Sequence, residues 1–151
     1  MIDLPPGYQL ERGSVKDRKL LIKFMELTYH ELFPQQSYFN HLTTTVDQYL
    51  SAKTPLWWII FSGDKVAGLW MGNGIDQVSG DRYGHIFLVY VTPEYRRRGL
   101  ATTLIKVAQD WVISRGENKL GLQVFNINQP AVNLYDNLGF QTQSRLMFKE
   151  F

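Results

Sequence analysis

The stretch VYVTPEYRRRGLATTLI, residues 89–105, places three consecutive arginines between an apolar run typical of a β-strand and an apolar-periodic run typical of an α-helix. The first backbone N–H groups of a helix have no partner inside the helix, and the helix dipole is positive at that end, so such a junction attracts phosphate. Gly99 lets the backbone approach an anion closely, while Arg96, Arg97 and Arg98 add charge and bidentate donors. We therefore predict that the junction binds a polyphosphate.

Charge alone leaves a second interpretation open, because a run of arginines can also be a solvated turn or a basic surface patch. The glycine pattern excludes two known phosphate loops. A Walker loop would need Gly-Lys followed by Ser or Thr, and the dinucleotide pattern would need a second and a third glycine. The junction therefore predicts a phosphate site of another kind.

The composition limits the number of domains and the kinds of function that the chain can have. With 151 residues, the chain fits one ordinary domain, and we expect a single domain over residues 1–151. Lys and Arg number 16 against 14 Asp and Glu, so the formal charge of +2 argues against a nucleic-acid partner. The absence of cysteine removes disulfides, thiolate zinc sites and a cysteine nucleophile, and we expect no metal.

The sequence also carries a prediction about location. The first residues, MIDLPPGYQLERG, hold two prolines and two acids and lack the apolar centre of an export signal. No run approaches the roughly 20 apolar residues of a membrane span. We therefore expect a cytoplasmic protein without a membrane partner.

Periodicity and turn signals predict an alternation of strands and helices. Ser14 and Asp17 are typical of a helix start, and the helical stripe that follows runs to Pro34. We expect Gly72 and Gly74 to break the second arm of a hairpin. The expected strands are Tyr8–Arg12, Leu56–Phe61, Val66–Met71, His85–Val91, Leu120–Phe125 and one or two within Phe140–Phe151, and the further helices are Thr45–Ala52, Gly99–Arg115 and Pro130–Leu138.

Two segments together resemble a known family. Arg96, Gly99 and Ala101 match motif A of the GNAT superfamily of acyl-CoA-dependent N-acyltransferases, with Ala101 in place of its second glycine. Downstream, NINQPAVNLYDNLGF resembles motif B of the same family, with Asn128 and Tyr135 among its matching positions. The resemblance implies a mixed α/β (α+β) fold, with a mostly antiparallel central sheet of about six to seven strands and about four helices on its faces.

The resemblance also implies a cofactor, acetyl-CoA, as co-substrate. In the family, the motif A loop holds the pyrophosphate, the preceding strand pairs with the pantetheine arm, and the motif B asparagine hydrogen-bonds the cofactor. An asparagine before Gln129 and Pro130 can also serve as a helix N-cap, and both roles can hold. The implied cofactor-binding residues are Val89, Tyr90, Val91, Arg96, Arg97, Arg98, Gly99, Leu100, Ala101, Thr102 and Asn128.

Two residues are candidates for proton transfer. Tyr135 resembles the family tyrosine that protonates the departing thiolate, and a phenol with a pKa of about 10 is well matched to a thiol. His85 occupies a position where some members carry a carboxylate base, and an imidazole can accept a proton at neutral pH. The alternatives are core packing for Tyr135 and a polar strand end for His85. Without a cysteine, direct attack of the amine on the thioester is the more economical route.

The acceptor is expected to be a small-molecule or peptide amine. The resemblance places its site near TYHELFPQQSYFNHL, residues 28–42, and SRLMF, residues 144–148, where aromatic side chains could wall a pocket or simply pack on the sheet. Dimers are common in the family, so a homodimer is an open expectation. Two other functions stay open: a non-catalytic acyl-CoA-binding module of the same fold, and a nucleic-acid-binding module using the arginines.

Overall fold

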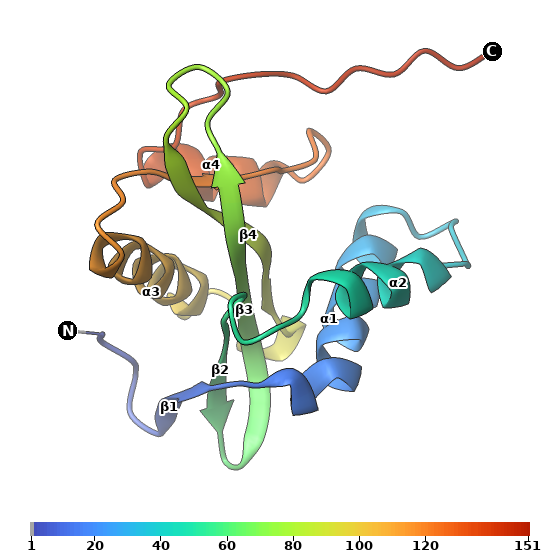
Figure 1. Ribbon diagram of the computed structural model, residues 1–151. Helices are drawn as coiled ribbons and strands as arrows, with labels where there is room; N and C mark the ends of the chain where they lie inside the picture. Colours follow the sequence, from blue (N-terminus) through green and yellow to red (C-terminus); the bar gives the residue numbers. More distant parts are fainter. Residues whose placement is uncertain (1) are drawn as a thin grey trace.

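One sheet of five strands forms the centre of the protein, in the order β1-β2-β3-β4-β5 (Figure 1). The computed structural model describes residues 2–151. Neighbouring strands are antiparallel except β4 and β5, which are parallel. The strands are β1 (Tyr8–Arg12), β2 (Leu56–Phe61), β3 (Asp64–Ile75), β4 (Arg82–Val91) and β5 (Leu120–Leu122).

Helices cover both faces of the sheet (Figure 1). They are α1 (Arg18–Leu32), α2 (Asn40–Tyr49), α3 (Leu100–Ser114) and α4 (Gln129–Asn137). Trp58, Trp70 and Leu88 pack with α1 and α2 on one face. Leu69 and Met71 pack with α3 on the other face, where Tyr135 of α4 joins the edge of the same cluster. The sheet is therefore buried between two layers, as its long apolar strands predict.

Local sequence signals explain where two helices begin. Ser14 and Asp17 form a capping box around a short 3-10 turn that leads directly into α1, which confirms the predicted helix start. Asn128 caps α4 by accepting a hydrogen bond from the Ala131 N–H at 3.4 Å. The second helix begins earlier than expected, at Asn40 rather than Thr45.

The expected sheet of six to seven strands is wrong, because the described residues form five. β5 stops at Leu122, short of the expected Phe125, and residues 140–151 form no strand. The pattern of the last segment suits a strand, but a strand requires a neighbouring edge to pair its backbone. In residues 2–151, that segment has none.

Gly72 and Gly74 do not break β3, contrary to expectation, and the strand runs on to Ile75. A Cβ on Gly72 would lie 2.1 Å from the ring of Phe87, and one on Gly74 would lie 2.4 Å from the ring of Tyr83. These glycines make room for aromatic rings of β4, a role that the sequence of one strand does not reveal.

Among the described residues, no helix has the length and apolar character of a bilayer span.

Candidate functional site

An opening between β4 and β5 is the central feature of the candidate site. β5 pairs with β4 only at Gly84, His85 and Ile86. On the other side of β4, Trp70 of β3 pairs with Leu88, and the next residue of β3, Met71, pairs with Ile86. Phe87 is therefore an extra residue in β4, opposite no residue of β3. A β-bulge bends its strand and increases the local twist. The bulge at Phe87 therefore marks the point where β4 separates from β5.

Beyond the bulge, one backbone edge of β4 faces the opening. The Thr92 N–H donates to Val66 of β3 at 2.9 Å, so the backbone groups of Val91 and Val89 point to the opposite side, towards β5. The Val91 carbonyl already accepts a hydrogen bond from Arg96 Nε at 2.9 Å. The opening thus offers a strand-like edge to an extended ligand.

The loop that follows β4 brings the start of α3 to the same end of the strand. Pro93–Tyr95 form one 3-10 turn, and Gly99 is the N-cap of α3 with a φ of 77°. Arg97 is also left-handed, with a φ of 62°. A Cβ added to Gly99 would meet no atom within 4 Å. The first N–H groups of α3, from Leu100 to Thr102, therefore receive no side-chain cap and can bind an anion.

The three arginines have different surroundings. The Arg98 guanidinium donates to the Tyr8 hydroxyl at 2.7 Å and lies over the ring of Tyr95. Arg96 is bound by Glu31 of α1. Arg97 is exposed at the turn. Two of the guanidiniums thus tie the loop to β1 and α1, while all three arginine residues are exposed to solvent.

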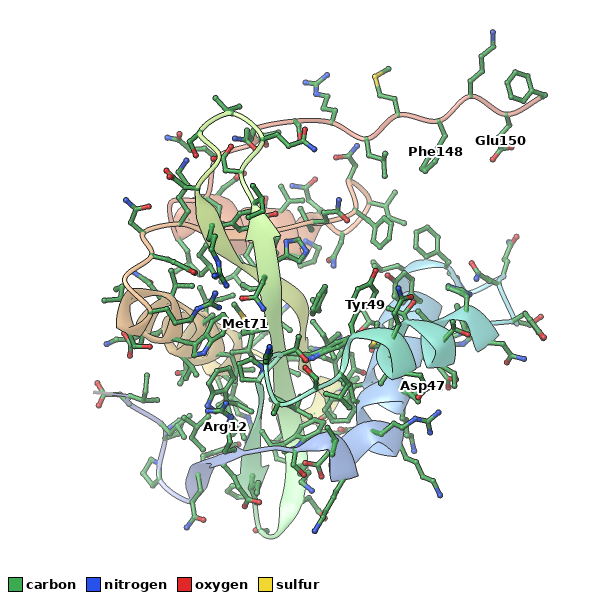
Figure 2. The ribbon with its side chains drawn as sticks, viewed as in Figure 1. Arg12, Asp47, Tyr49, Met71, Phe148 and Glu150 are labelled. Atoms are coloured by element: carbon green, nitrogen blue, oxygen red, sulfur yellow. The ribbon has the colours of Figure 1, made fainter. Side chains whose placement is uncertain are left out.

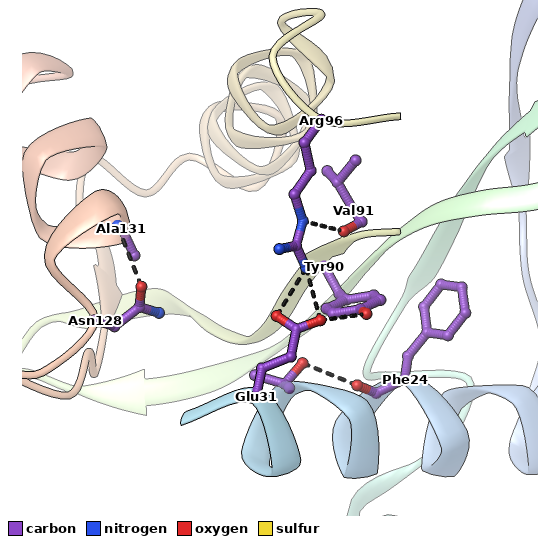
Figure 3. Close-up of polar contacts among 8 residues, drawn as sticks. Phe24, Glu31, Tyr90, Val91, Arg96, Asn128 and Ala131 are labelled. Atoms are coloured by element: carbon purple, nitrogen blue, oxygen red, sulfur yellow. Dashed lines mark hydrogen bonds and ion pairs between the residues drawn. The ribbon is translucent and has the colours of Figure 1, made fainter. Parts of the chain in front are cut away.

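Glu31, Tyr90 and Arg96 form a network that connects α1 to the loop (Figure 3). The Glu31 carboxylate accepts two hydrogen bonds from Arg96 Nη2, at 2.9 and 2.8 Å, and one from the Tyr90 hydroxyl at 2.8 Å. Burial and the hydrogen bond to Glu31 raise the pKa of Tyr90 to about 12. Arg96 also binds the Val91 carbonyl, so the network holds the edge of the opening in place.

Glu31→Gln is expected to weaken this network, because the neutral amide cannot accept charge-assisted bonds from Arg96. The pair is part-exposed, so we expect a loss of about 1 kcal/mol and a fall in Tm of about 2–4 °C. The matched control is Asp47→Asn, which removes another exposed carboxylate paired with an arginine, Arg18. A fall in Tm as small as that of the control, measured by thermal denaturation, would show that the network contributes nothing beyond a surface ion pair.

The two motif B residues lie on α4. Tyr135 is half-buried, its ring is 5.5 Å from that of Phe140, and burial raises the pKa of its phenol. It belongs to the cluster on the α3 face that also includes Val89 and Val91. The amide oxygen of Asn128 is engaged as the N-cap of α4 (Figure 3).

His85 lies in the paired part of β4, on the face that carries α1 and α2. Its ring is 5.4 Å from that of Phe87, and its Nδ1 is 3.4 Å from the Tyr83 hydroxyl. Burial lowers the pKa of His85 below its ordinary value of 6.5. The imidazole is therefore neutral at pH 7 and able to accept a proton. His85 and Tyr135 lie on opposite faces of the sheet.

Aromatic side chains from the end of α1 gather beside the segment after β5. The ring of Phe125 is 5.7 Å from Tyr29 and 5.1 Å from Phe33, and Tyr29 is 6.5 Å from His41 of α2. Burial raises the pKa of Tyr29. The expected grouping with SRLMF is not observed, since residues 144–148 are exposed and lie outside the helices and strands.

Sequence reasoning missed two parts of the site. The bulge at Phe87 lies within the apolar run IFLVYV and carries no turn signal. Glu31 lies in the segment 28–42, which the family resemblance places near the acceptor site, and its pairing with Arg96 joins positions 65 residues apart. No local pattern predicts a contact at that separation.

Comparison with known proteins places the chain among acetyltransferases. A family model described as "Acetyltransferase (GNAT) family" matches residues 21–140. An "Acetyltransferase" of Yersinia pestis (strain Pestoides F) is 32% identical over 88 residues, which cover 58% of this chain and 62% of that protein. The N-terminal acetyltransferase B complex catalytic subunit NAA20 of Arabidopsis thaliana is 31% identical over 120 residues, or 78% of this chain and 63% of that protein. The chain thus spans less than two thirds of the length of either relative.

Solved structures share the fold at low identity. A predicted acetyltransferase from Clostridium acetobutylicum, determined with acetyl-CoA, superposes with a TM-score of 0.77 at 17% identity and covers 95% of this chain and 96% of that chain. AAC(6')-Iy in complex with the bisubstrate analog CoA-S-monomethyl-acetylneamine superposes with a TM-score of 0.71 at 16% identity, covering 95% and 97%. At these identities, the likeness concerns the fold.

Proposed function

The chain belongs to the GNAT acetyltransferase family, and on this premise we propose that it transfers the acetyl group of acetyl-CoA to a primary amine by direct attack in a ternary complex. The observation that carries the proposal is the opening between β4 and β5, which begins at the Phe87 bulge and leads to the uncapped N-terminus of α3. A strand edge followed by a phosphate-binding helix start suits a ligand that has an amide-containing arm and a pyrophosphate.

The residues present fit acetyl-CoA. The backbone N–H groups from Arg97 to Thr102 would hold the pyrophosphate, assisted by the exposed side chain of Arg97. The backbone of Val89 and Val91 would bind the pantetheine arm. Bound acetyl-CoA supplies an activated thioester. Arg96 and Arg98 support this surface through Glu31 and Tyr8.

Tyr135 is proposed as the general acid that protonates the departing thiolate. The burial that raises its pKa keeps the phenol protonated throughout the physiological range, as a proton donor must be. His85 is proposed as the general base for the amine. Its position on the face of α1 and α2 allows the amine to be deprotonated on one side of the sheet and the thiolate protonated on the other.

His85→Gln is expected to lower kcat by about 10–100-fold if the imidazole accepts the proton. Because the pKa of His85 lies below 6.5, the wild-type rate should fall only as the pH drops beneath that value, when the imidazole becomes charged. The variant should lose this inflection, which a pH profile of kcat would measure. His30→Gln, at an exposed histidine of α1, is the control. An unchanged profile in the His85 variant would exclude the base role.

The same burial predicts a stability effect. The folded-state pKa of His85 is below that of the unfolded chain, so the unfolded state binds more protons near pH 6 and stability falls as the pH decreases. His85→Gln should remove this part of the acid sensitivity, whatever the role of the residue in catalysis. Thermal denaturation at pH 7.5 and pH 5.5 would measure it.

We propose the aromatic cluster around Tyr29, Phe33 and Phe125 as one wall of the amine site, since aromatic faces attract cationic groups. The decisive test is an assay of acetyl-CoA with small amines, aminoglycosides and peptides, in which a thiol reagent detects released coenzyme A. The chain has no cysteine, so the reagent reports only the product. Binding of acetyl-CoA without thiol release with any amine would instead support a non-catalytic module.

A further inference from the structure

A basic cavity lies beside the C-terminal end of α3. It has a volume of about 280 Å³, close to the lower end of the about 300–1,000 Å³ that is typical of small-ligand sites. Its cationic lining residues are Arg12, Lys53, Arg82 and Arg115, and none of the described residues that line it is acidic. A concave site lined by one sign of charge concentrates ions of the opposite sign.

The cavity forms where β3 runs past the start of β2. The loop before β2 crosses this edge of β3, and there the Pro55 carbonyl accepts a hydrogen bond from the Met71 N–H at 2.9 Å. Figure 2 labels Met71 on β3 and Arg12 below it, between β1 and α3. Arg12 ends β1, Arg82 begins β4 and Arg115 is the C-cap of α3. Separate segments thus bring like charges together, which raises the electrostatic free energy unless a counter-charge is near.

The charge of the cavity is only partly neutralised. Glu117 Oε2 accepts a hydrogen bond from Arg115 Nη2 at 2.8 Å and lies 3.7 Å from Arg82 Nε. Within residues 2–151, Arg12 and Lys53 form no ion pair. Four cations against one carboxylate therefore leave an excess of three positive charges.

Aromatic rings hold two of the guanidiniums in place. The Arg115 guanidinium lies 4.1 Å from the centre of the Trp111 ring, and that of Arg12 lies 4.7 Å from the centre of the Trp57 ring. Arg115 Nη1 is buried and has no hydrogen-bond partner among the described residues. A buried charged donor without a partner is costly, and an anion in the cavity that Arg115 lines would supply one.

The end of α3 does not oppose an anion through free carbonyls. The Val112 carbonyl accepts hydrogen bonds from the N–H groups of Arg115 and Glu117, and the Ile113 carbonyl accepts one from the Gly116 N–H. The opposite end of the same helix carries the junction proposed for the pyrophosphate. With 15 residues at about 1.5 Å each, α3 separates the two places by about 22 Å.

We propose that this cavity is a second anion site, which binds a phosphate group, either as the free ion or as the monoester of a small molecule. A phosphate dianion matches the excess of positive charge, and its oxygens match the planar forks of arginine. The proposal goes beyond the acetyltransferase reaction and does not depend on it, because it concerns binding at the other end of α3.

The four tryptophans of the chain provide reporters for the first test. Trp111 lines the cavity and Trp57 lies beneath Arg12, whereas Trp58 and Trp70 are fully buried with α1 and α2 on the opposite face. Titration with inorganic phosphate at constant ionic strength should shift the indole N–H signals of Trp111 and Trp57 in ¹H–¹⁵N NMR spectra until they saturate, and leave the other two unchanged. Residues 89–105 contain no tryptophan, so phosphate bound at the junction does not produce this signal. An unchanged Trp111 signal would overturn the proposal.

A second test removes two of the cations. Arg12→Gln with Arg82→Gln is expected to weaken phosphate binding at least about 10-fold, because charge-assisted hydrogen bonds are lost. Arg115 is left unchanged because its side chain is only 19% exposed and is held in an ion pair. The matched control is Arg145→Gln with Lys149→Gln, which removes the same charge from exposed residues outside the cavity and should bind like the wild type. Equal weakening in both variants would reduce the effect to general charge attraction and overturn the site.

Phenyl phosphate distinguishes the two sources of the phosphate group. Tighter binding than that of inorganic phosphate, with the same shift of the Trp111 signal, would identify a monoester of a small molecule as the ligand. Equal or weaker binding would identify the free ion. Acetate is the control for a single charge, and acetate binding as tight as that of phosphate would overturn the assignment to a phosphate group.

Discussion

Combining Arg97→Glu with Gly99→Asp is expected to weaken acetyl-CoA binding by about 100-fold, which corresponds to about 2.7 kcal/mol. The first substitution replaces an exposed arginine of the junction with an acid, and the second places a carboxylate at the N-cap of α3. Both acids would repel a pyrophosphate, and the carboxylate introduced at the N-cap could itself cap the helix N–H groups. Isothermal titration with acetyl-CoA, coenzyme A and ATP would measure the loss.

The design avoids two sources of misinterpretation. Arg98 is left unchanged because it binds the Tyr8 hydroxyl, and its loss could disturb β1. Gly116→Asp is the matched control for backbone strain: Gly116 has a φ of 76°, and a Cβ there would meet no atom within 4 Å, as at Gly99. A non-glycine residue in this conformation costs about 1–2 kcal/mol at either position. Equal affinities of the junction variant and the wild type would show that the junction is not the phosphate site.

Tyr135→Phe is expected to lower kcat by about 100-fold with little change in the affinity for acetyl-CoA, because general acid catalysis typically contributes about 100-fold or more. The substitution keeps the ring that packs against Phe140 and removes only the hydroxyl. The rate should be lost across the whole pH range from about 6 to 9, since burial raises the pKa of this phenol and keeps it protonated there.

Tyr95→Phe provides the control, since Tyr95 is another half-buried tyrosine, with its ring packed against Tyr8 and Phe61. It should retain nearly full activity. Steady-state kinetics with the best amine from the thiol assay, together with titration of acetyl-CoA, separate the acid role from cofactor binding. If Tyr135→Phe turns over at the wild-type rate, a water molecule or another residue protonates the thiolate.

Much of the fold could be predicted because its signals are local. The apolar runs LWWIIF and IFLVYV predict strands, and the periodic residues of 100–114 predict α3. The capping box of Ser14 and the N-cap at Asn128 lie within three residues of the groups that they bind. The same holds for the junction that we propose as the phosphate site, because the end of β4, Gly99 and the start of α3 follow one another closely in the chain.

Local sequence thus specifies the helices and strands, the family resemblance and the place of the helix start that we propose as the anion site, since each depends on residues a few positions apart. Tertiary structure decided what required distant partners. The Phe87 bulge exists only relative to β3, Arg96 is bound by a glutamate 65 positions away, and Gly72 accommodates a ring from the neighbouring strand. The last segment shows the same limit: its pattern suits a strand, yet a strand forms only where another backbone edge is available, and within the described chain none is adjacent to it.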